Sequence, residues 1–317
     1  MSIEAAVQTA LSRRDVGEAH RLLAEAGDKG DAAAAFELGR WFLSGQIVPR
    51  DLTVSRNWFG KAASLGHPRS QLIHAALLGN GIGGARDWQS ALGELRRASA
   101  QTPQAAEELR LLDLMAIDDQ GNPGSLPASE AVSDSPTIYW ARALFSAAEC
   151  DALVSIAAPL LNASVVVDPA TGQMRADPIR TSEAAMFPWI DETPFIHALN
   201  RRIAAASGTM VEQGEPLQVL RYSPGQEYRS HSDALAGAEN QRIMTALVYL
   251  NEDFEGGETE FPAPGLKLRG GVGDALFFRN VDRHGQADAR ATHAGLPITA
   301  GQKWLASRWI RERPFGR

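Results

Sequence analysis

Short apolar runs separated by glycine- and proline-containing turns fill the C-terminal half of the chain. Leu217 to Ser223 is one such run, and it leads into the turn signal Pro224-Gly225. A second, longer apolar run extends from Arg242 to Leu250, and a third, from Gly273 to Phe278, begins at a turn. The last run, from Lys303 to Arg311, alternates between polar and apolar residues. Several short strands of this kind predict an all-β sandwich or barrel.

Alternation along these strands assigns side chains to faces, because positions i and i+2 of a strand point to the same side. The last strand places four alternate residues together: Lys303, Leu305, Ser307 and Trp309. The 242–250 strand does the same for Thr245, Leu247 and Tyr249. A lysine on the inner side of a barrel needs a fixed anion, because a buried ammonium without a partner is very costly.

The first 116 residues follow a helical pattern that repeats at a step of 36 residues. The residues that recur at this step are Gly30 and Gly66, Gly45 and Gly81, Asp51 and Asp87, Lys61 and Arg97, and Ala62 and Ala98. Alanine-rich helices broken by glycine at a fixed phase predict a helical-hairpin solenoid, in which each unit buries one face on the next.

The segment between these two patterns, residues 117–137, is rich in Gly, Pro, Ser and Asp, which predicts an exposed linker. Domain boundaries follow at 1–116, 117–137 and 138–317. Within the last domain, Ser146 to Glu149 fits a capping box that starts a helix running to about Leu161. Val165 to Val167 is a short strand, and Glu192 to Ala205 is a further helix.

Two histidines and one aspartate form the candidate metal site. His231 and Asp233 occupy positions i and i+2 of a strand and can grip one ion, and His293 follows in the same domain. Two imidazoles with one carboxylate suit non-haem Fe(II), because they take one face of an octahedron and leave the others open. His284, in a charged loop with Asp282 and Arg283, is a rival third ligand.

The segment from about 138 to 313 resembles the prolyl 4-hydroxylase branch of the 2-oxoglutarate/Fe(II) dioxygenases. The matching stretches are Arg221 to Asp233, Arg242 to Asn251, Gly256 to Pro262, Gly273 to Phe278, His293 to Pro297 and Gly301 to Trp304. The resemblance implies a double-stranded β-helix (jelly roll). With the helical repeats before it, the fold class is α+β multidomain.

The same resemblance implies roles for individual residues. His231, Asp233 and His293 correspond to the iron ligands, with His293 preferred over His284 because it stands ten residues before Lys303. Lys303 corresponds to the partner of the distal carboxylate of 2-oxoglutarate. Three residues fall where the family lines its co-substrate pocket: Tyr222, Thr245 and Tyr249. Three more fall where it meets the peptide: Arg180, Tyr228 and Arg242. For Arg242, an ordinary surface-strand arginine is an equal alternative.

The N-terminal pattern resembles a Sel1-like repeat, a relative of the tetratricopeptide type, in the run from Ala32 to Gly66. A second copy, Arg69 to Ala100, is degenerate, and residues 4–27 hold a partial first copy. Such arrays offer a concave surface to another protein. A spacer or a dimerisation element is an equal alternative.

Charge and cysteine content narrow the remaining possibilities. The formal net charge of −7 argues against nucleic acid as a bulk electrostatic partner. The single cysteine, Cys150, excludes an intrachain disulfide framework and is expected to fill a core position. The first residues carry an early acid and no apolar leader, and no later run is long enough to span a bilayer, so we expect a cytoplasmic protein with no membrane partner.

By this resemblance, the expected function is Fe(II)- and 2-oxoglutarate-dependent hydroxylation of a prolyl residue in a peptide or protein. The reaction consumes O2, releases succinate and CO2, and is supported by ascorbate as reductant. Two alternatives remain open: a hydroxylase of a free amino acid or small metabolite, and a repeat-based adaptor whose barrel is not catalytic. An open groove framed by Tyr228, Arg242 and the Arg180 loop would favour the peptide, and a closed pocket the metabolite.

Overall fold

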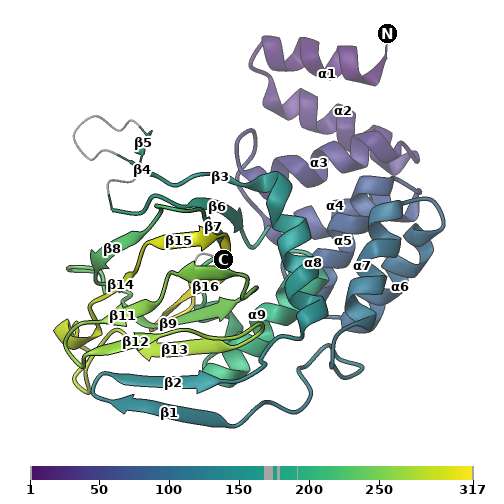
Figure 1. Cartoon of the computed structure of the whole chain (residues 1–317). Helices are drawn as coiled ribbons and strands as arrows, with labels where there is room; N and C mark the ends of the chain where they lie inside the picture. The colour runs from purple at the N-terminus through teal and green to yellow at the C-terminus, as the bar shows by residue number, and fades with distance from the viewer. Residues whose placement is uncertain (1, 168–173, 177–178, 191, 316–317) are drawn as a thin grey trace. The chain divides into compact units, whose positions relative to one another are not determined.

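The computed structural model describes residues 2–167, 174–176, 179–190 and 192–315. The chain forms two compact units (Figure 1). One contains Met1–Gly121 together with Glu192–His197, and the other contains Asn122–Asp191 and Ala198–Arg317. Within the described residues, no helix combines the length and the apolar character needed to cross a membrane.

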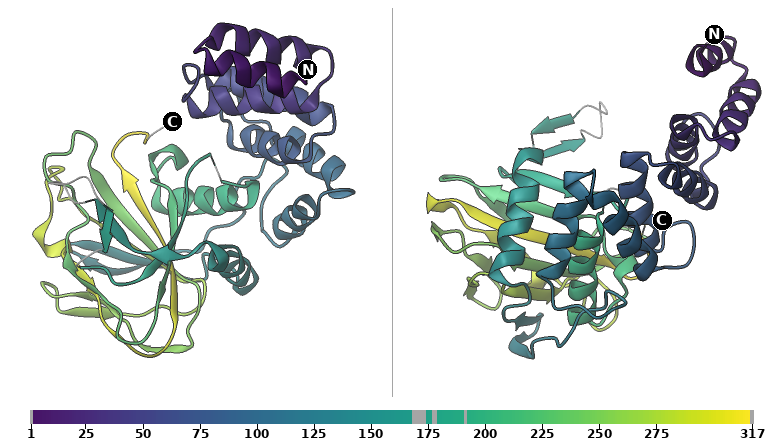
Figure 2. Two further views of the ribbon diagram at one scale, coloured as in Figure 1. Left: turned by 90° about the horizontal axis from the view of Figure 1, so that it is seen from above. Right: turned by 90° about the vertical axis from the view of Figure 1, so that its right-hand side faces the viewer.

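The first unit is built from antiparallel helices in which each helix packs on the next along the chain (Figure 1, Figure 2). These helices are α1 (Ile3–Ser12), α2 (Val16–Asp28), α3 (Ala32–Ser44), α4 (Leu52–Ser64), α5 (Pro68–Asn80), α6 (Trp88–Ser99) and α7 (Pro103–Asp113). Close approach depends on small residues. A Cβ on Gly39 would lie 2.8 Å from the ring of Phe59, which is fully buried.

The helix ends confirm the predicted 36-residue repeat. Helices α3 and α5 both end at a left-handed glycine, Gly45 and Gly81, and each has a φ of 68°. Helices α4 and α6 both begin after an aspartate N-cap: Asp51 accepts from the backbone N–H of Val54, and Asp87 from that of Ser90. The same chemistry at the same phase makes the two hairpins equivalent units.

The second unit is a sandwich of antiparallel strands (Figure 1). The larger sheet has the order β1 (Ser129–Asp134), β2 (Thr137–Ala141), β13 (Ala275–Arg279), β9 (Arg242–Tyr249), β16 (Lys303–Arg311), β7 (Leu217–Tyr222), β6 (Glu183–Phe187) and β3 (Asn162–Ala163). The smaller sheet has the order β12 (Leu266–Leu268), β11 (Thr259–Phe261), β14 (His293–Gly295) and β8 (Tyr228–His231). Two further pairs join β10 (Phe254–Gly256) to β15 (Ile298–Gly301), and β4 (Val165–Val167) to β5 (Met174–Ala176).

One apolar core fills the space between the sheets, as the jelly-roll prediction requires. It is supplied from both layers, for example by Tyr249 and Phe278 of the larger sheet and Phe261 of the smaller. The predicted strands at 217–223, 242–250, 273–278 and 303–311 correspond to β7, β9, β13 and β16. The expected barrel is therefore confirmed.

Two helices that follow β2 in the chain also agree with the sequence prediction. Helix α8 (Ala147–Ala157) begins with the predicted capping box, in which Ser146 and Glu149 bond to each other's backbone N–H. Helix α9 (Pro194–Ser207) matches the expected 192–205 helix. Glu149 also accepts from the guanidinium of Arg202 of α9 at 2.7 Å, and this buried ion pair ties the two helices together.

The predicted linker at 117–137 is wrong in its last part. Residues Ser129–Asp134 form β1, which pairs with β2 and is the edge strand of the larger sheet. The strand has a polar sequence because only Val132 packs against the core, so most of its side chains face solvent. Composition cannot distinguish such an edge strand from a connector.

Candidate active site

Strand pairing brings the candidate metal ligands together. In the smaller sheet, β8 and β14 run antiparallel with His231 directly opposite His293, and the two ring centroids lie 4.3 Å apart. Asp233 follows β8 by two residues. One ligand atom from each of the three residues can be chosen so that all lie within 4.8 Å of one another. His284 lies in a different hollow, beside Arg283, so the structure places His293 and not His284 in the cluster.

The hydrogen bonds of the imidazoles leave the Nε2 atoms available to a metal. The Nδ1 atom of His231 lies 2.8 Å from the carbonyl oxygen of Arg229, and that of His293 lies 3.1 Å from the carbonyl oxygen of Ala291. A carbonyl only accepts, so each Nδ1 carries the proton and each Nε2 keeps its lone pair. The Nε2 of His231 is buried with no hydrogen-bond partner among the described residues. An orphaned acceptor aimed into such a cluster fits a metal ion.

The charge states also fit metal binding. Burial lowers the pKa of His293 to about 4, although the nearby Asp233 opposes the shift, so the imidazole is neutral near pH 7. For Asp233 burial acts to raise the pKa, but the neighbouring imidazoles and the Thr245 hydroxyl outweigh burial and hold the pKa well below its usual value. An ionised carboxylate that is almost fully buried beside two imidazoles is the donor set expected for Fe(II).

Lys303 is the buried cation that the strand phase predicts. It lies at the start of β16 opposite Tyr222 of β7, is 3% exposed, and donates to the carbonyl oxygen of Gly257 at 2.7 Å. Burial lowers its pKa to about 7, with Glu258 partly opposing the shift. No carboxylate in the described parts of the chain forms an ion pair with its Nζ. The ammonium can therefore form an ion pair with a bound anion that is not part of the chain.

The metal cluster and Lys303 line one cavity inside the sandwich. Leu305, Ser307 and Trp309 line it as well, so the predicted common face of β16 is confirmed. Thr259 and several aliphatic side chains complete the wall. One chamber thus holds a metal site and a separate buried cation.

The three predicted co-substrate residues occupy different positions. Tyr222 lines the cavity, with its ring centroid 6.0 Å from the Lys303 Nζ. Tyr249 lies beneath that Nζ at 5.0 Å, fully buried, and its hydroxyl is 3.0 Å from the Thr259 hydroxyl. Thr245 lines the cavity too, but its hydroxyl donates to Asp233 at 2.6 Å, which makes it a partner of a metal ligand.

Two of the three predicted substrate contacts, Tyr228 and Arg180, line the same cavity as the metal ligands. The Tyr228 ring stacks on His231 with the centroids 3.5 Å apart and an interplanar angle of 17°. The Arg180 guanidinium lies 5.6 Å from the Tyr228 ring, and the two residues also form a β-bridge. Both line the cavity and are partly exposed. Together they form a polar and aromatic border beside the metal site.

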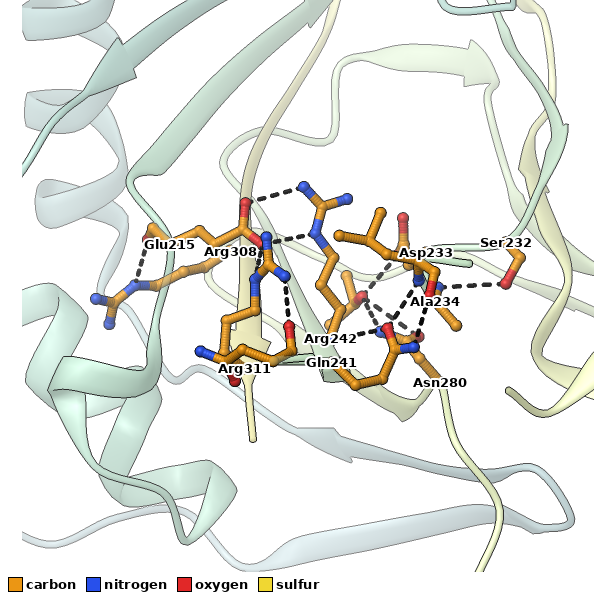
Figure 3. Close-up of polar contacts among 12 residues, drawn as sticks. Glu215, Ser232, Asp233, Ala234, Gln241, Arg242, Asn280, Arg308 and Arg311 are labelled. Atoms are coloured by element: carbon orange, nitrogen blue, oxygen red, sulfur yellow. Dashed lines mark hydrogen bonds and ion pairs between the residues drawn. The ribbon is translucent and has the colours of Figure 1, made fainter. Parts of the chain in front are cut away.

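Arg242 is bound within the protein rather than in the cavity wall. Its guanidinium makes two hydrogen bonds to Glu215, at 2.6 and 2.9 Å (Figure 3). The guanidinium also lies 3.7 Å from the centroid of the Trp309 ring. Arg311 shares the same Glu215 carboxylate. Contact of Arg242 with a substrate stays a prediction. Trp309, on the same face of β16 as Lys303, lines the cavity.

Asn280 is a site residue that sequence reasoning missed. It follows β13, is 1% exposed, and its amide Nδ2 donates to the Thr245 hydroxyl at 3.0 Å. The residue stands just past the end of a strand, and no periodicity or motif distinguishes it from a turn asparagine.

Comparison with known proteins relates the chain to a family of oxygenases. Residues 217–311 match the sequence profile of a family described as the 2OG-Fe(II) oxygenase superfamily. "Prolyl 4-hydroxylase 1" of Arabidopsis thaliana is 37% identical over 203 residues, which cover 58% of this chain and 72% of the relative. "Prolyl 4-hydroxylase subunit alpha-1" of Rattus norvegicus is 32% identical over 191 residues, which cover 57% of this chain and 35% of the relative.

Two solved structures resemble different parts of the chain. The viral collagen prolyl hydroxylase of Paramecium Bursaria Chlorella virus-1, in its 2OG complex, is 29% identical with a TM-score of 0.45, covering 57% of this chain and 98% of the viral one. A Sel1 repeat protein from Oxalobacter formigenes is 28% identical with a TM-score of 0.29, covering 34% of this chain and 94% of the other.

Proposed function

The chain belongs to the prolyl 4-hydroxylase family of 2OG-Fe(II) oxygenases, and on this premise we propose that it hydroxylates prolyl residues within peptide segments of a protein. Its metal is Fe(II) and its co-substrate is 2-oxoglutarate. The observation that carries the proposal is the single cavity lined by both the His231, Asp233 and His293 cluster and the buried Lys303. The cavity therefore offers two separate binding points, one for the metal and one for the distal carboxylate of 2-oxoglutarate.

The residues of this chain bind and orient the reactants. His231 and His293 would hold the metal through Nε2 and Asp233 through a carboxylate oxygen, while Lys303 would neutralise the distal carboxylate of 2-oxoglutarate. Bound Fe(II), 2-oxoglutarate and O2 supply the oxidising chemistry, in which one oxygen atom enters the substrate and the other enters the succinate released with CO2. The aliphatic walls, such as Leu305, keep water away from this chemistry.

A peptide fits the cavity better than a free amino acid does. Among the described residues that line it, Asp233 is the only carboxylate, and it is committed to the metal site. The ammonium of a free amino acid would therefore find no anion there, whereas a prolyl residue inside a peptide has neutral amides on both sides. Tyr228 and Arg180, partly exposed beside the metal ligands, offer aromatic and hydrogen-bonding contacts to such a chain.

We propose further that the helical repeats recruit a protein partner, whether the substrate or an accessory protein. The stacked hairpins of α1 to α7 form an extended surface of the kind that repeat proteins use for binding. A cytoplasmic location belongs to the same proposal. It is supported by a single cysteine, Cys150, which is buried and free, as suits a reducing compartment.

The direct test is succinate release and substrate mass measured together. Purified protein is incubated with Fe(II), 2-oxoglutarate, ascorbate and O2, with and without proline-containing peptides, and Asp233→Ala is run beside it. We expect peptide-stimulated succinate release and the gain of one oxygen atom on proline, both lost in Asp233→Ala. A peptide of the same sequence with alanine in place of proline is the matched substrate control.

Each alternative function predicts a different result in this assay. Faster turnover of free proline or another small amine than of any peptide would favour the metabolite hydroxylase. If the protein binds neither Fe(II) nor 2-oxoglutarate under anaerobic conditions, the oxygenase proposal is wrong and the adaptor becomes the better account. Capture of the same partner by wild type and Asp233→Ala would then assign function to the repeats alone.

A further inference from the structure

The carboxylate of Asp233 is held by one short hydrogen bond from inside the barrel. The Thr245 hydroxyl lies 2.6 Å from Oδ2, and both residues are almost fully buried. The ionised carboxylate can only accept, so Thr245 must donate its single proton to it. The carboxylate oxygens meanwhile lie 3.6 Å from Nε2 of His231 and 3.7 Å from Nε2 of His293. Rotation of this carboxylate would change which oxygen faces a metal.

A second side chain fixes the direction of that hydroxyl proton. Asp233 and Asn280 lie close together (Figure 3), and the Thr245 hydroxyl links them by accepting from the Asn280 amide Nδ2 at 3.0 Å. Asn280 Oδ1, the other acceptor near the hydroxyl, is farther away at 3.4 Å than the Asp233 oxygen at 2.6 Å, so the proton goes to Asp233. Because the threonine oxygen accepts from the amide on one side, its proton is directed to the carboxylate on the other. Leucine in place of Asn280 would leave the hydroxyl free to turn away from Asp233.

The backbone holds Asn280 rigidly enough for this task. Its N–H donates to the carbonyl oxygen of Ile243 at 2.9 Å, and its carbonyl oxygen accepts from the N–H of Asp288 at 3.0 Å. Ile243 belongs to β9, the strand that also carries Thr245. The amide and the hydroxyl are thus set by neighbouring backbone, and burial excludes water that could replace either hydrogen bond.

We propose that Asn280 is a positioning residue of the metal site, which acts through Thr245 to fix the orientation of the Asp233 carboxylate. The relay runs from the Asn280 amide to the Thr245 hydroxyl and from that hydroxyl to Asp233. In this proposal Thr245 orients a metal ligand in addition to lining the co-substrate pocket. The inference rests on the proposed metal site, since a positioning residue needs a ligand to position.

The test measures affinity for a metal alone, with no 2-oxoglutarate and no turnover. Metal-free full-length protein is titrated with Co(II), and binding is followed by visible absorption. We expect Thr245→Val to weaken binding ~10- to 100-fold, as is usual for loss of a partner of a metal ligand. Asn280→Leu should weaken it by about tenfold, because the hydroxyl survives but loses its direction. Thr245→Ser, which keeps the hydroxyl, should retain the wild-type affinity.

The double variant decides whether Asn280 acts through Thr245. If it does, Asn280→Leu has no further effect on the Co(II) dissociation constant in the Thr245→Val background. Full additivity of the two effects overturns the relay, and so does an unchanged affinity in Asn280→Leu. Ser55→Ala removes a buried hydroxyl outside the site, the one that donates to the carbonyl oxygen of Gly39 in the helical repeats, and should leave Co(II) affinity unchanged.

Two further measurements distinguish a loss of folding from a loss of metal binding. A purely structural role for Asn280 would lower the unfolding temperature of the metal-free protein while leaving the Co(II) dissociation constant unchanged, which overturns the proposal. If Asn280→Leu does not fold, Asn280→Ala is held to the same criteria. If the wild type itself binds no Co(II), the proposed metal site is wrong, and the relay is rejected with it.

Discussion

Replacing Lys303 with methionine should stabilise the metal-free protein while abolishing co-substrate binding. The native pKa of Lys303 is about 7 against an ordinary value of 10.5, and each unit of pKa corresponds to ~1.4 kcal/mol. Burial of this group therefore costs on the order of 4 kcal/mol at pH 7. Methionine has similar length and no charge, and it gives up only the hydrogen bond to Gly257, worth ~1 kcal/mol. We expect a net gain of ~2–3 kcal/mol in the free energy of unfolding.

Binding of 2-oxoglutarate should change in the opposite direction. Without Lys303 the distal carboxylate would be buried without its paired ammonium, which costs ~3–5 kcal/mol. That is a rise of more than ~100-fold in the dissociation constant. Urea unfolding of the metal-free protein gives the first quantity. Anaerobic calorimetry of 2-oxoglutarate binding to the Fe(II)-loaded protein gives the second.

The pH dependence gives a signature of the same lysine. Between pH 7 and 10.5 the unfolded chain keeps a proton that the native state has released, so the stability of the wild type rises with pH through this window. Lys303→Met should lack that rise. The affinity of the wild type for 2-oxoglutarate should fall above pH 7, because the bound dianion needs the ammonium form.

An exposed lysine provides the matched control. Lys267 of β12 has a side chain 60% exposed and lies 3.4 Å from Glu260, so Lys267→Met should leave both stability and 2-oxoglutarate affinity nearly unchanged. The reasoning is refuted if Lys303→Met is less stable than the wild type at pH 7. It is equally refuted if that variant binds 2-oxoglutarate within a few-fold of the wild type.

Three further predictions concern other parts of the chain. Tyr249→Phe, which removes a buried hydroxyl whose pKa burial raises to about 12, should cost ~1 kcal/mol in urea unfolding, and no loss would contradict the hydrogen bond. Gly273→Ala should destabilise by well over ~2 kcal/mol, because φ is 81° and a Cβ would lie 1.9 Å from a carbonyl oxygen, whereas Gly285→Ala, with φ 74° and open space, should cost only ~1 kcal/mol. Burial raises the pKa of Glu108 to about 7 from 4.5, so the free energy of unfolding of the wild type should fall as pH rises between these values. Urea titrations at several pH values should show a shallower fall for Glu108→Gln.

The parts of this protein that the sequence predicts are those governed by a period. The 36-residue step places Gly45 and Gly81 at equivalent helix ends, because a left-handed helix end accepts glycine far more readily than other residues. The two-residue period of β16 places Lys303 and Trp309 on the cavity wall. The edge strand β1 is not predicted from the sequence, because it is polar and mostly exposed and its residues do not alternate between polar and apolar.

The interactions that the sequence does not predict join residues whose only link is the tertiary fold. Arg242 was assigned to substrate or solvent, yet Glu215 binds it, and the register of β9 on β16 is what brings Arg242 beside Trp309. Asn280 reaches Thr245 because it follows, by two residues, Phe278 of β13, which lies opposite Thr245 of β9. Strand register is fixed by the whole core rather than by either strand. The ligands of a metal can therefore be predicted from a motif, while the side chains that orient those ligands require the structure.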